Sequence, residues 1–192
     1  MSANQLERDD LDGFTRVLHA GLTGLGLLAW LTGELAGDYK KLRHLGFDIH
    51  SWLGISLSLF ILLRIIYGFI GPPEVRFSQW LPYNKERLAL VWEDLQTLLR
   101  LQLPQRPAHQ GLKALIQGFG LAVFAWMALT GSLMFFYLEP GHRARGMLHL
   151  IKEVHEIGHW LIPIFLGLHL SGVLLDAWFG QGKWRKMFFL AE

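Results

Sequence analysis

Residues 155–169 read HEIGHWLIPIFLGLH, an apolar segment of helix length with a histidine at each end. Fourteen residues make about 3.9 turns of α-helix, so the imidazoles of His155 and His169 project within about 40° of each other and lie roughly 21 Å apart along the axis. One helix face therefore carries two metal ligands at two depths. The same residues contain H-E-I-G-H, which matches the zinc-protease pattern H-E-x-x-H. The choice between two stacked cofactor sites and one zinc site decides the predicted function.

The apolar residues of the chain gather in four long runs. Of its 192 residues, 52% are hydrophobic and 18% are charged. The runs cover about residues 17–35, 49–70, 115–138 and 157–179. Each is long enough to cross a hydrocarbon layer of about 30 Å as a helix, and four of them in so short a chain disfavour a soluble core. We predict an all-α integral membrane four-helix bundle, in a single membrane domain over residues 1–192.

The segment 71–111 is too long for a simple connection between two spans. It predicts an amphipathic helix over about residues 85–101, with an apolar face formed by Leu88, Val91, Trp92, Leu95 and Leu99 opposite Glu86, Glu93, Asp94 and Arg100. We expect this helix at the membrane interface, and packing on a partner protein is the alternative. Loop 71–111, Lys113 just after it and the two termini together carry eleven Lys and Arg residues, against six on the other side. The positive-inside rule then places both termini in the cytoplasm of a multi-pass protein of the bacterial inner membrane.

The absence of cysteine narrows the chemistry. It excludes disulfides, iron–sulfur clusters and covalent attachment of c-type haem. Any metal centre must therefore use histidine and carboxylate ligands. The N-terminus, MSANQLERDDLDG, is polar and acidic, so we expect no cleavable signal peptide. We expect contact with membrane lipid and none with nucleic acid.

Each histidine can be given a depth because alternate spans run in opposite directions. His50 and His155 lie near the outer start of their spans, whereas His19 and His169 lie toward the cytoplasm. This pairing predicts two bis-imidazole sites at two depths. Haem b suits such sites because it is apolar, lies within helix bundles and accepts two axial imidazoles without covalent attachment.

Three further residues bear on these sites. His159 competes with His155 for the outer site, and His44 competes with His50. Arg64 lies fourteen residues after His50, so it is on the same face of the helix as His50 and at the depth of the inner site. An intramembrane arginine pairs with an anionic group, such as a haem propionate, or snorkels to the interface, and both alternatives stay open here.

The zinc interpretation would use His155 and His159 as ligands and Glu156 as a base. It needs a third ligand, and Asp176 lies roughly 25 Å from His159 along the same helix. It also leaves the other intramembrane histidines without a role. An intramembrane zinc metalloprotease is therefore the less favoured prediction.

Three segments resemble the bacterial cytochrome b561 family, which is related to the cytochrome b subunits of nickel–iron hydrogenases and of membrane formate dehydrogenase. They read TRVLHAGL, HSWLGISLSLFILLR and HEIGHWLIPIFLGLH. The resemblance covers all four spans and implies two haems b. It implies axial ligands at His19, His50, His155 and His169, with Arg64 near the inner haem. In the formate dehydrogenase cytochrome the segment entering the third span helps to bind quinone. This makes His109 and Lys113, in AHQGLK, candidate quinone contacts.

Together these features predict a di-haem b-type membrane cytochrome that transfers electrons between the quinone pool and a periplasmic donor or acceptor. Two roles compete. The chain is either the membrane subunit of a redox complex, with a periplasmic redox subunit or a c-type cytochrome as partner, or a free-standing quinone oxidoreductase with a diffusible donor such as superoxide. The long basic loop favours an assembly. A homodimer also stays open.

Overall fold

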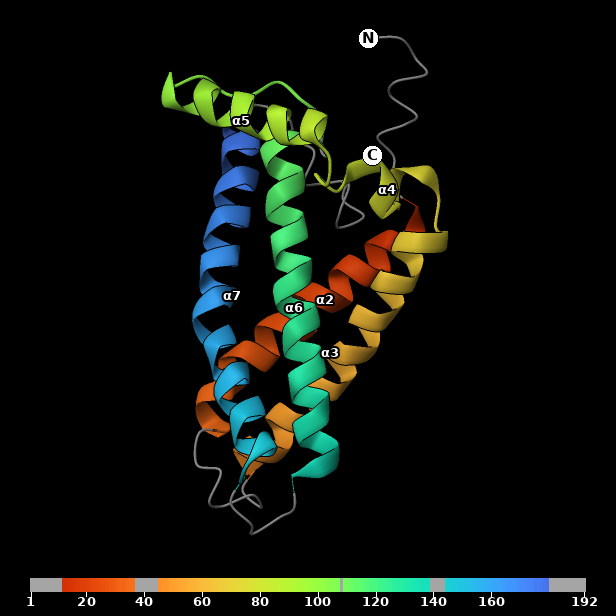
Figure 1. Cartoon of the computed structure of the whole chain (residues 1–192), viewed down its shortest axis with the longest axis vertical. Coiled ribbons are helices and arrows are strands. Elements are labelled where there is room, and N and C mark those ends of the chain that lie inside the picture. The colour runs from red at the N-terminus through yellow and green to blue at the C-terminus, as the bar shows by residue number, and fades with distance from the viewer. Residues whose placement is uncertain (1–11, 37–44, 108, 139–143, 180–192) are drawn as a thin grey trace. The chain divides into compact units, whose positions relative to one another are not determined.

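The computed structural model describes residues 12–36, 45–107, 109–138 and 144–179, and all regular structure in these ranges is helical. The long helices are α2 (Gly13–Gly33), α3 (Leu45–Ile70), α6 (Gly111–Tyr137) and α7 (Met147–Trp178). The short ones are η1 (Glu34–Ala36), η3 (Pro73–Val75), α4 (Phe77–Trp80) and α5 (Lys85–Leu99) (Figure 1). Within the described ranges, four helical segments are long and apolar enough to cross a membrane. The predicted all-α class with four spans is confirmed.

The helices extend beyond the apolar runs that predict them. α7 starts at Met147 rather than near residue 157, and its first turns are charged. Lys152 and Glu156, one turn apart in these turns, form an ion pair, and such pairs stabilise helix outside an apolar layer. α5 covers Lys85–Leu99 against the predicted 85–101, and Asn84 caps it by accepting a hydrogen bond from the Arg87 amide at 2.9 Å.

The chain divides into two compact units. One unit comprises Asp12–Ile65 and Ala122–Ile164. The other contains Ile66–Leu121 and the residues from Phe165 onward. Because α3, α6 and α7 contribute to both units, the division crosses continuous helices rather than a linker.

Small residues join the helices of the first unit. Gly21 of α2 lies so close to the ring of Phe60 on α3 that any side chain at position 21 would collide with it. Ser132 of α6 donates a hydrogen bond to Ser58 of α3 at 3.2 Å. Close approach at glycine and hydroxyl pairs are the usual contacts between helices in membranes.

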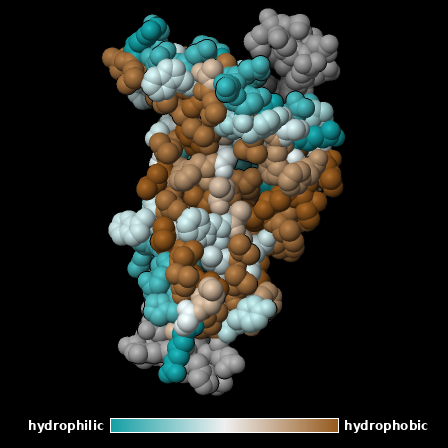
Figure 2. Space-filling model, in the orientation of Figure 1, coloured by the Kyte–Doolittle hydropathy of each residue, from teal (hydrophilic) through white to brown (hydrophobic). Residues whose placement is uncertain are grey.

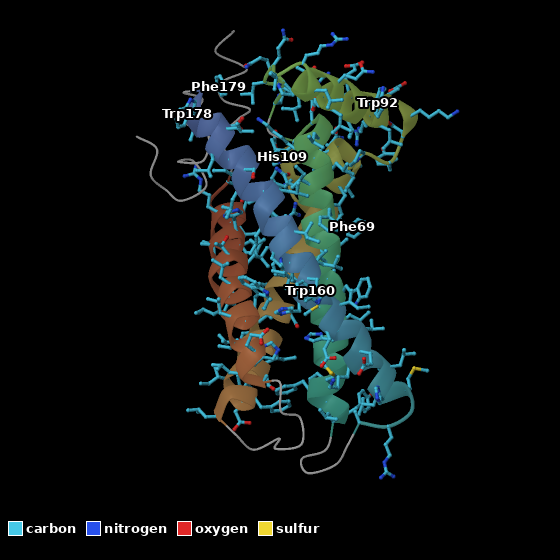
Figure 3. The ribbon with its side chains drawn as sticks, turned by 90° about the vertical axis from the view of Figure 1, so that its left-hand side faces the viewer. Phe69, Trp92, His109, Trp160, Trp178 and Phe179 are labelled. Atoms are coloured by element: carbon cyan, nitrogen blue, oxygen red, sulfur yellow. The ribbon has the colours of Figure 1, made fainter. Side chains whose placement is uncertain are left out.

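Large apolar side chains cover much of the surface shown in Figure 2. Leu31, Leu129 and Leu174, on three different long helices, are 60%, 65% and 68% exposed, and Trp160 of α7 is also exposed (Figure 3). Soluble monomers rarely expose contiguous apolar surface of this kind. These side chains therefore face the hydrocarbon of a membrane.

Candidate functional site

Two of the predicted ligands, His50 of α3 and His155 of α7, lie close together in the first unit. Their ring centroids are 6.3 Å apart and their planes are inclined by 78°. α3 carries His50 in its second turn, and α7 carries His155 in its third turn. The structure thus brings together the pair that depth matching assigns to the outer site.

The Nδ1 atom of each ring has its own hydrogen-bond partner. His50 Nδ1 lies 2.9 Å from the carbonyl oxygen of Ala29, which can only accept, so this nitrogen carries the proton. His155 Nδ1 lies 2.8 Å from Thr130 Oγ1. The Thr130 hydroxyl itself donates to the carbonyl of Trp126 at 2.8 Å, so His155 Nδ1 is again the donor. In both neutral rings the lone pair is then on Nε2, which is the form that binds a metal.

The separation of the two rings fits one metal ion between them. A metal–imidazole bond is about 2.0–2.1 Å long, and a ring nitrogen lies about 1.1 Å from its centroid, so opposed imidazoles on one ion place their centroids about 6.2–6.4 Å apart. His50 and His155 have this separation. Their Nδ1 contacts are the outer-shell hydrogen bonds that orient metal-bound histidine. These residues therefore fit a bis-imidazole haem b.

Glycines leave space beside both rings. A methyl group added at Gly33 would lie 3.6 Å from His50 Cε1, and one added at Gly131 would lie 3.1 Å from His155 Cε1. At Gly54, one turn after His50, an added methyl group would meet no neighbouring atom within 4 Å. The backbone at these positions leaves room for a flat cofactor.

His159, the competing outer ligand, faces a carboxylate. Its Nδ1 lies 3.3 Å from Glu34 Oε1, and its side chain is 42% exposed. His44 lies outside the described residues. Within the described ranges, no three or more His, Cys, Asp or Glu side chains are grouped to hold a metal ion. The H-E-x-x-H pattern at 155–159 therefore finds no third ligand among them.

The predicted inner residues are divided between the two units. His19 and Arg64 belong to the first unit and His169 to the second, so their pairing stays a prediction. The ring of Phe165 stacks on that of His169, with centroids 5.4 Å apart and planes inclined by 26°. Gly172, three residues after His169, has no neighbouring atom within 4 Å of the position a side chain would take.

The two candidate quinone contacts have different surroundings in the second unit. His109 lines a pocket of about 210 Å³, together with Gln79, Trp80, Pro82, Arg87, Leu90, Gln110, Gly111 and Ala114. Its Nδ1 lies 2.9 Å from Gln117 Oε1, and its ring centroid lies 6.4 Å from that of Trp80 (Figure 3). Lys113 Nζ instead lies 2.7 and 2.9 Å from the carboxylate oxygens of Asp176, in an ion pair between α6 and α7.

Sequence reasoning missed the groups that hold the outer rings. The Thr130-Gly131 pair could have been noticed in the sequence, since a hydroxyl beside a glycine interrupts an otherwise apolar run. The carbonyl of Ala29 could not, because every residue has a backbone carbonyl. Trp30 was also missed: its Nε1–H is buried and has no hydrogen-bond partner among the described residues.

Comparison with known proteins supports the haem interpretation of this geometry. The family model described as "Prokaryotic cytochrome b561" matches residues 10–190. Searches of curated proteins and of solved structures found no match. The matched region contains all four long helices and every predicted ligand, and proteins of this family bind haem b. The chain therefore belongs to the prokaryotic cytochrome b561 family.

Proposed function

We propose that this chain is a di-haem b cytochrome that transfers electrons between the quinone pool and a periplasmic donor or acceptor. Its family makes it a membrane haem b electron-transfer protein. The observation that carries the proposal is the His50–His155 pair, with 6.3 Å between the ring centroids. Haem b would supply reversible one-electron chemistry, and His50 and His155 are the residues that would hold it.

In this proposal His50 and His155 hold the outer haem through Nε2. The Ala29 carbonyl and the Thr130 hydroxyl keep the rings in place by accepting their Nδ1–H groups. Such outer-shell acceptors also make an imidazole a stronger ligand. These two contacts would fix the orientation of both ligands.

The inner haem would be held by His19 and His169. Depth matching supports this pair, and the open space at Gly172 supports a flat group beside His169. Arg64 would pair with an anionic substituent of the same cofactor. An arginine within an apolar span needs such a partner or a path to the interface.

We place the quinone head group in the pocket beside His109. With Nδ1 donating to the Gln117 amide oxygen, His109 has its lone pair on Nε2. Oxidation of one quinol would release two electrons, one for each of the two proposed haems, and two protons, of which His109 Nε2 would accept one and water the other. Lys113 is not among the residues that line this pocket, and its ammonium group is paired with Asp176, so we assign it no direct contact with the quinone.

The partner at the outer surface sets the direction of electron flow. An electron that crosses the whole membrane gains or loses about 2.3 kcal/mol per 100 mV. We favour a membrane subunit with both termini in the cytoplasm of the inner membrane, bound to a periplasmic redox subunit or c-type cytochrome. A free-standing enzyme that uses superoxide is the alternative, and either form could be a homodimer. Co-purification of a redox subunit supports the first role, and activity of the isolated chain with a diffusible donor supports the second.

Rapid anaerobic mixing of the haem-loaded protein with a short-chain ubiquinol tests the quinone step. We expect quinol to reduce the haem, and His109→Phe to slow this reduction by about a hundredfold because a proton acceptor is lost. His149→Phe is the matched control, since His149 is an exposed histidine of α7 paired with Glu153. Haem that quinol does not reduce would contradict the proposal.

A further inference from the structure

α5 exposes an apolar stripe along its whole length. The stripe consists of Leu88, Trp92, Leu95 and Leu99, which are 49%, 62%, 37% and 83% exposed. Their spacing of four, three and four residues places them on one face of a helix. A polar face that includes Glu93 and Gln96 lies beside this stripe, so α5 presents an apolar and a polar surface side by side.

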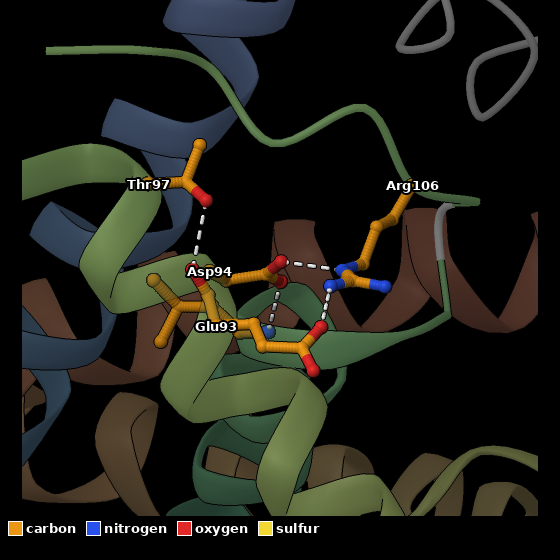
Figure 4. Close-up of polar contacts among 5 residues, drawn as sticks. Glu93, Asp94, Thr97 and Arg106 are labelled. Carbon is orange, nitrogen blue, oxygen red and sulfur yellow. Dashed lines mark hydrogen bonds and ion pairs between the residues drawn. The ribbon is translucent and has the colours of Figure 1, made fainter. Parts of the chain in front are cut away.

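A third face of α5 is buried against the start of α6. Asp94 is 2% exposed. Its carboxylate accepts hydrogen bonds from the Leu112 amide at 2.9 Å and from Arg106 Nε at 2.5 Å (Figure 4). Arg106 also binds Glu93, and its hydrogen bond to Asp94 raises the pKa of Arg106, which keeps the guanidinium charged. α5 is thus fastened across the first turn of a membrane-spanning helix (Figure 1).

The end of α5 adds one more exposed apolar side chain. Leu101 has a φ of 57°, in the left-handed region, and its side chain is 97% exposed. The Gln102 amide donates to the Thr97 carbonyl and the Leu101 amide to the Leu98 carbonyl, as in a Schellman motif. Glycine is the usual residue at this position of the motif. A leucine here is strained and, in water, also exposes its side chain at a cost.

We propose that the apolar stripe and Leu101 are inserted among lipids at the membrane surface. The attachment of α5 to the first turn of a span places the helix at this surface, and Trp and Tyr are the residues enriched there. Tyr83, just before α5, and Trp92, which is labelled in Figure 3, are both well exposed. Insertion in lipid also accounts for a leucine where the backbone favours glycine.

Apolar burial, rather than charge, would drive this insertion. Between residues 85 and 100 the chain carries three basic and three acidic side chains, namely Lys85, Arg87, Arg100, Glu86, Glu93 and Asp94. A helix without net charge gains little from anionic lipids. The proposal therefore predicts insertion into zwitterionic membranes and little dependence on salt.

Single-cysteine spin labels test the depth of α5 directly, because the chain contains no cysteine. The probe positions are Leu99→Cys on the stripe, Gln96→Cys on the polar face and Leu129→Cys within α6. Each labelled protein is reconstituted with haem in phosphatidylcholine vesicles, and its collisions with oxygen and with a water-soluble nickel chelate are measured. Leu95→Cys replaces Leu99→Cys if that variant does not assemble.

The oxygen-to-nickel collision ratio should be several-fold higher at position 99 than at position 96, and lower than at position 129. Nickel collisions at position 99 equal to those at position 96 would place the stripe in water and overturn the proposal. Protection of position 99 from both reagents would overturn it as well, because a protein surface, such as a second copy of the chain, would then cover the stripe. Neither outcome depends on quinone chemistry.

Discussion

Thr130 Oγ1 on α6 lies 2.8 Å from His155 Nδ1 on α7. This contact fixes the tautomer of the ring, since the threonine hydroxyl donates its own proton to the Trp126 carbonyl. Nε2 of His155 is thereby left with the lone pair needed to bind a metal. One hydroxyl in an apolar span thus prepares a ligand on another helix.

Thr130→Val removes this acceptor while keeping the shape of the side chain. We expect the outer haem to bind about 10–100-fold more weakly, because loss of an outer-shell hydrogen bond has this effect at metal sites. Haem transfer to an acceptor protein, followed by absorbance, measures the change. Ser132→Ala is the control, because Ser132 bonds Ser58 instead of a histidine. Equal haem retention in both variants would remove Thr130 from the site.

Gly131→Val should prevent the outer haem from binding. A methyl group at position 131 already lies 3.1 Å from His155 Cε1, and valine adds two more carbons beside the ring. We expect loss of one haem with unchanged helix content by circular dichroism. Gly13→Val is the control, since a side chain at Gly13 meets no atom within 4 Å. A Gly131→Val protein with its full haem content would show that the ring can move.

His155→Ala and His159→Ala distinguish the two histidines of the H-E-x-x-H pattern. His155 faces His50, whereas His159 contacts Glu34. We expect His155→Ala to lose the outer haem and keep the inner one, and His159→Ala to keep both. Low-temperature absorbance spectra, in which the two haems are resolved, read the result. If His159→Ala lost the outer haem and His155→Ala kept it, His159 and not His155 would be the ligand.

Asp94→Ala should destabilise the attachment of α5. It leaves the Leu112 amide without its acceptor and Arg106 with only Glu93 as a partner. A buried donor without an acceptor costs about 1–3 kcal/mol of unfolding free energy. Glu93→Ala is the matched control, because the Glu93 side chain is 56% exposed and exposed pairs contribute under about 1 kcal/mol. Unfolding by denaturant in mixed micelles compares the two. Equal losses would mean that Asp94 does not anchor the helix.

Local patterns in the sequence predicted the four spans well and their ends less well. Apolar length is a property of consecutive residues, so each span appears in the sequence by itself. The start of α7 was predicted ten residues late because its first turns carry Lys152, Glu153 and Glu156. These charges lie outside an apolar window, yet Lys152 and Glu156 are spaced to pair on a helix.

Contacts between distant residues could not be read from such patterns. Asp94 was assigned to the polar face of the amphipathic helix, but the structure buries it. The assignment was wrong because its partners, Arg106 and the Leu112 amide, lie 12 and 18 residues away. Depth matching did pair His50 with His155, whose ring centroids lie 6.3 Å apart in the structure, since alternating direction orders the spans without knowledge of their packing.

The haem content of the purified chain tests the central claim most directly. The pyridine haemochrome assay, set against protein concentration, should give two haems b per chain. His169→Ala should give one, with the outer haem still present in the spectrum, because His50 and His155 remain. A chain that contains zinc and no haem, or a His169→Ala protein that still binds two haems, would contradict the account.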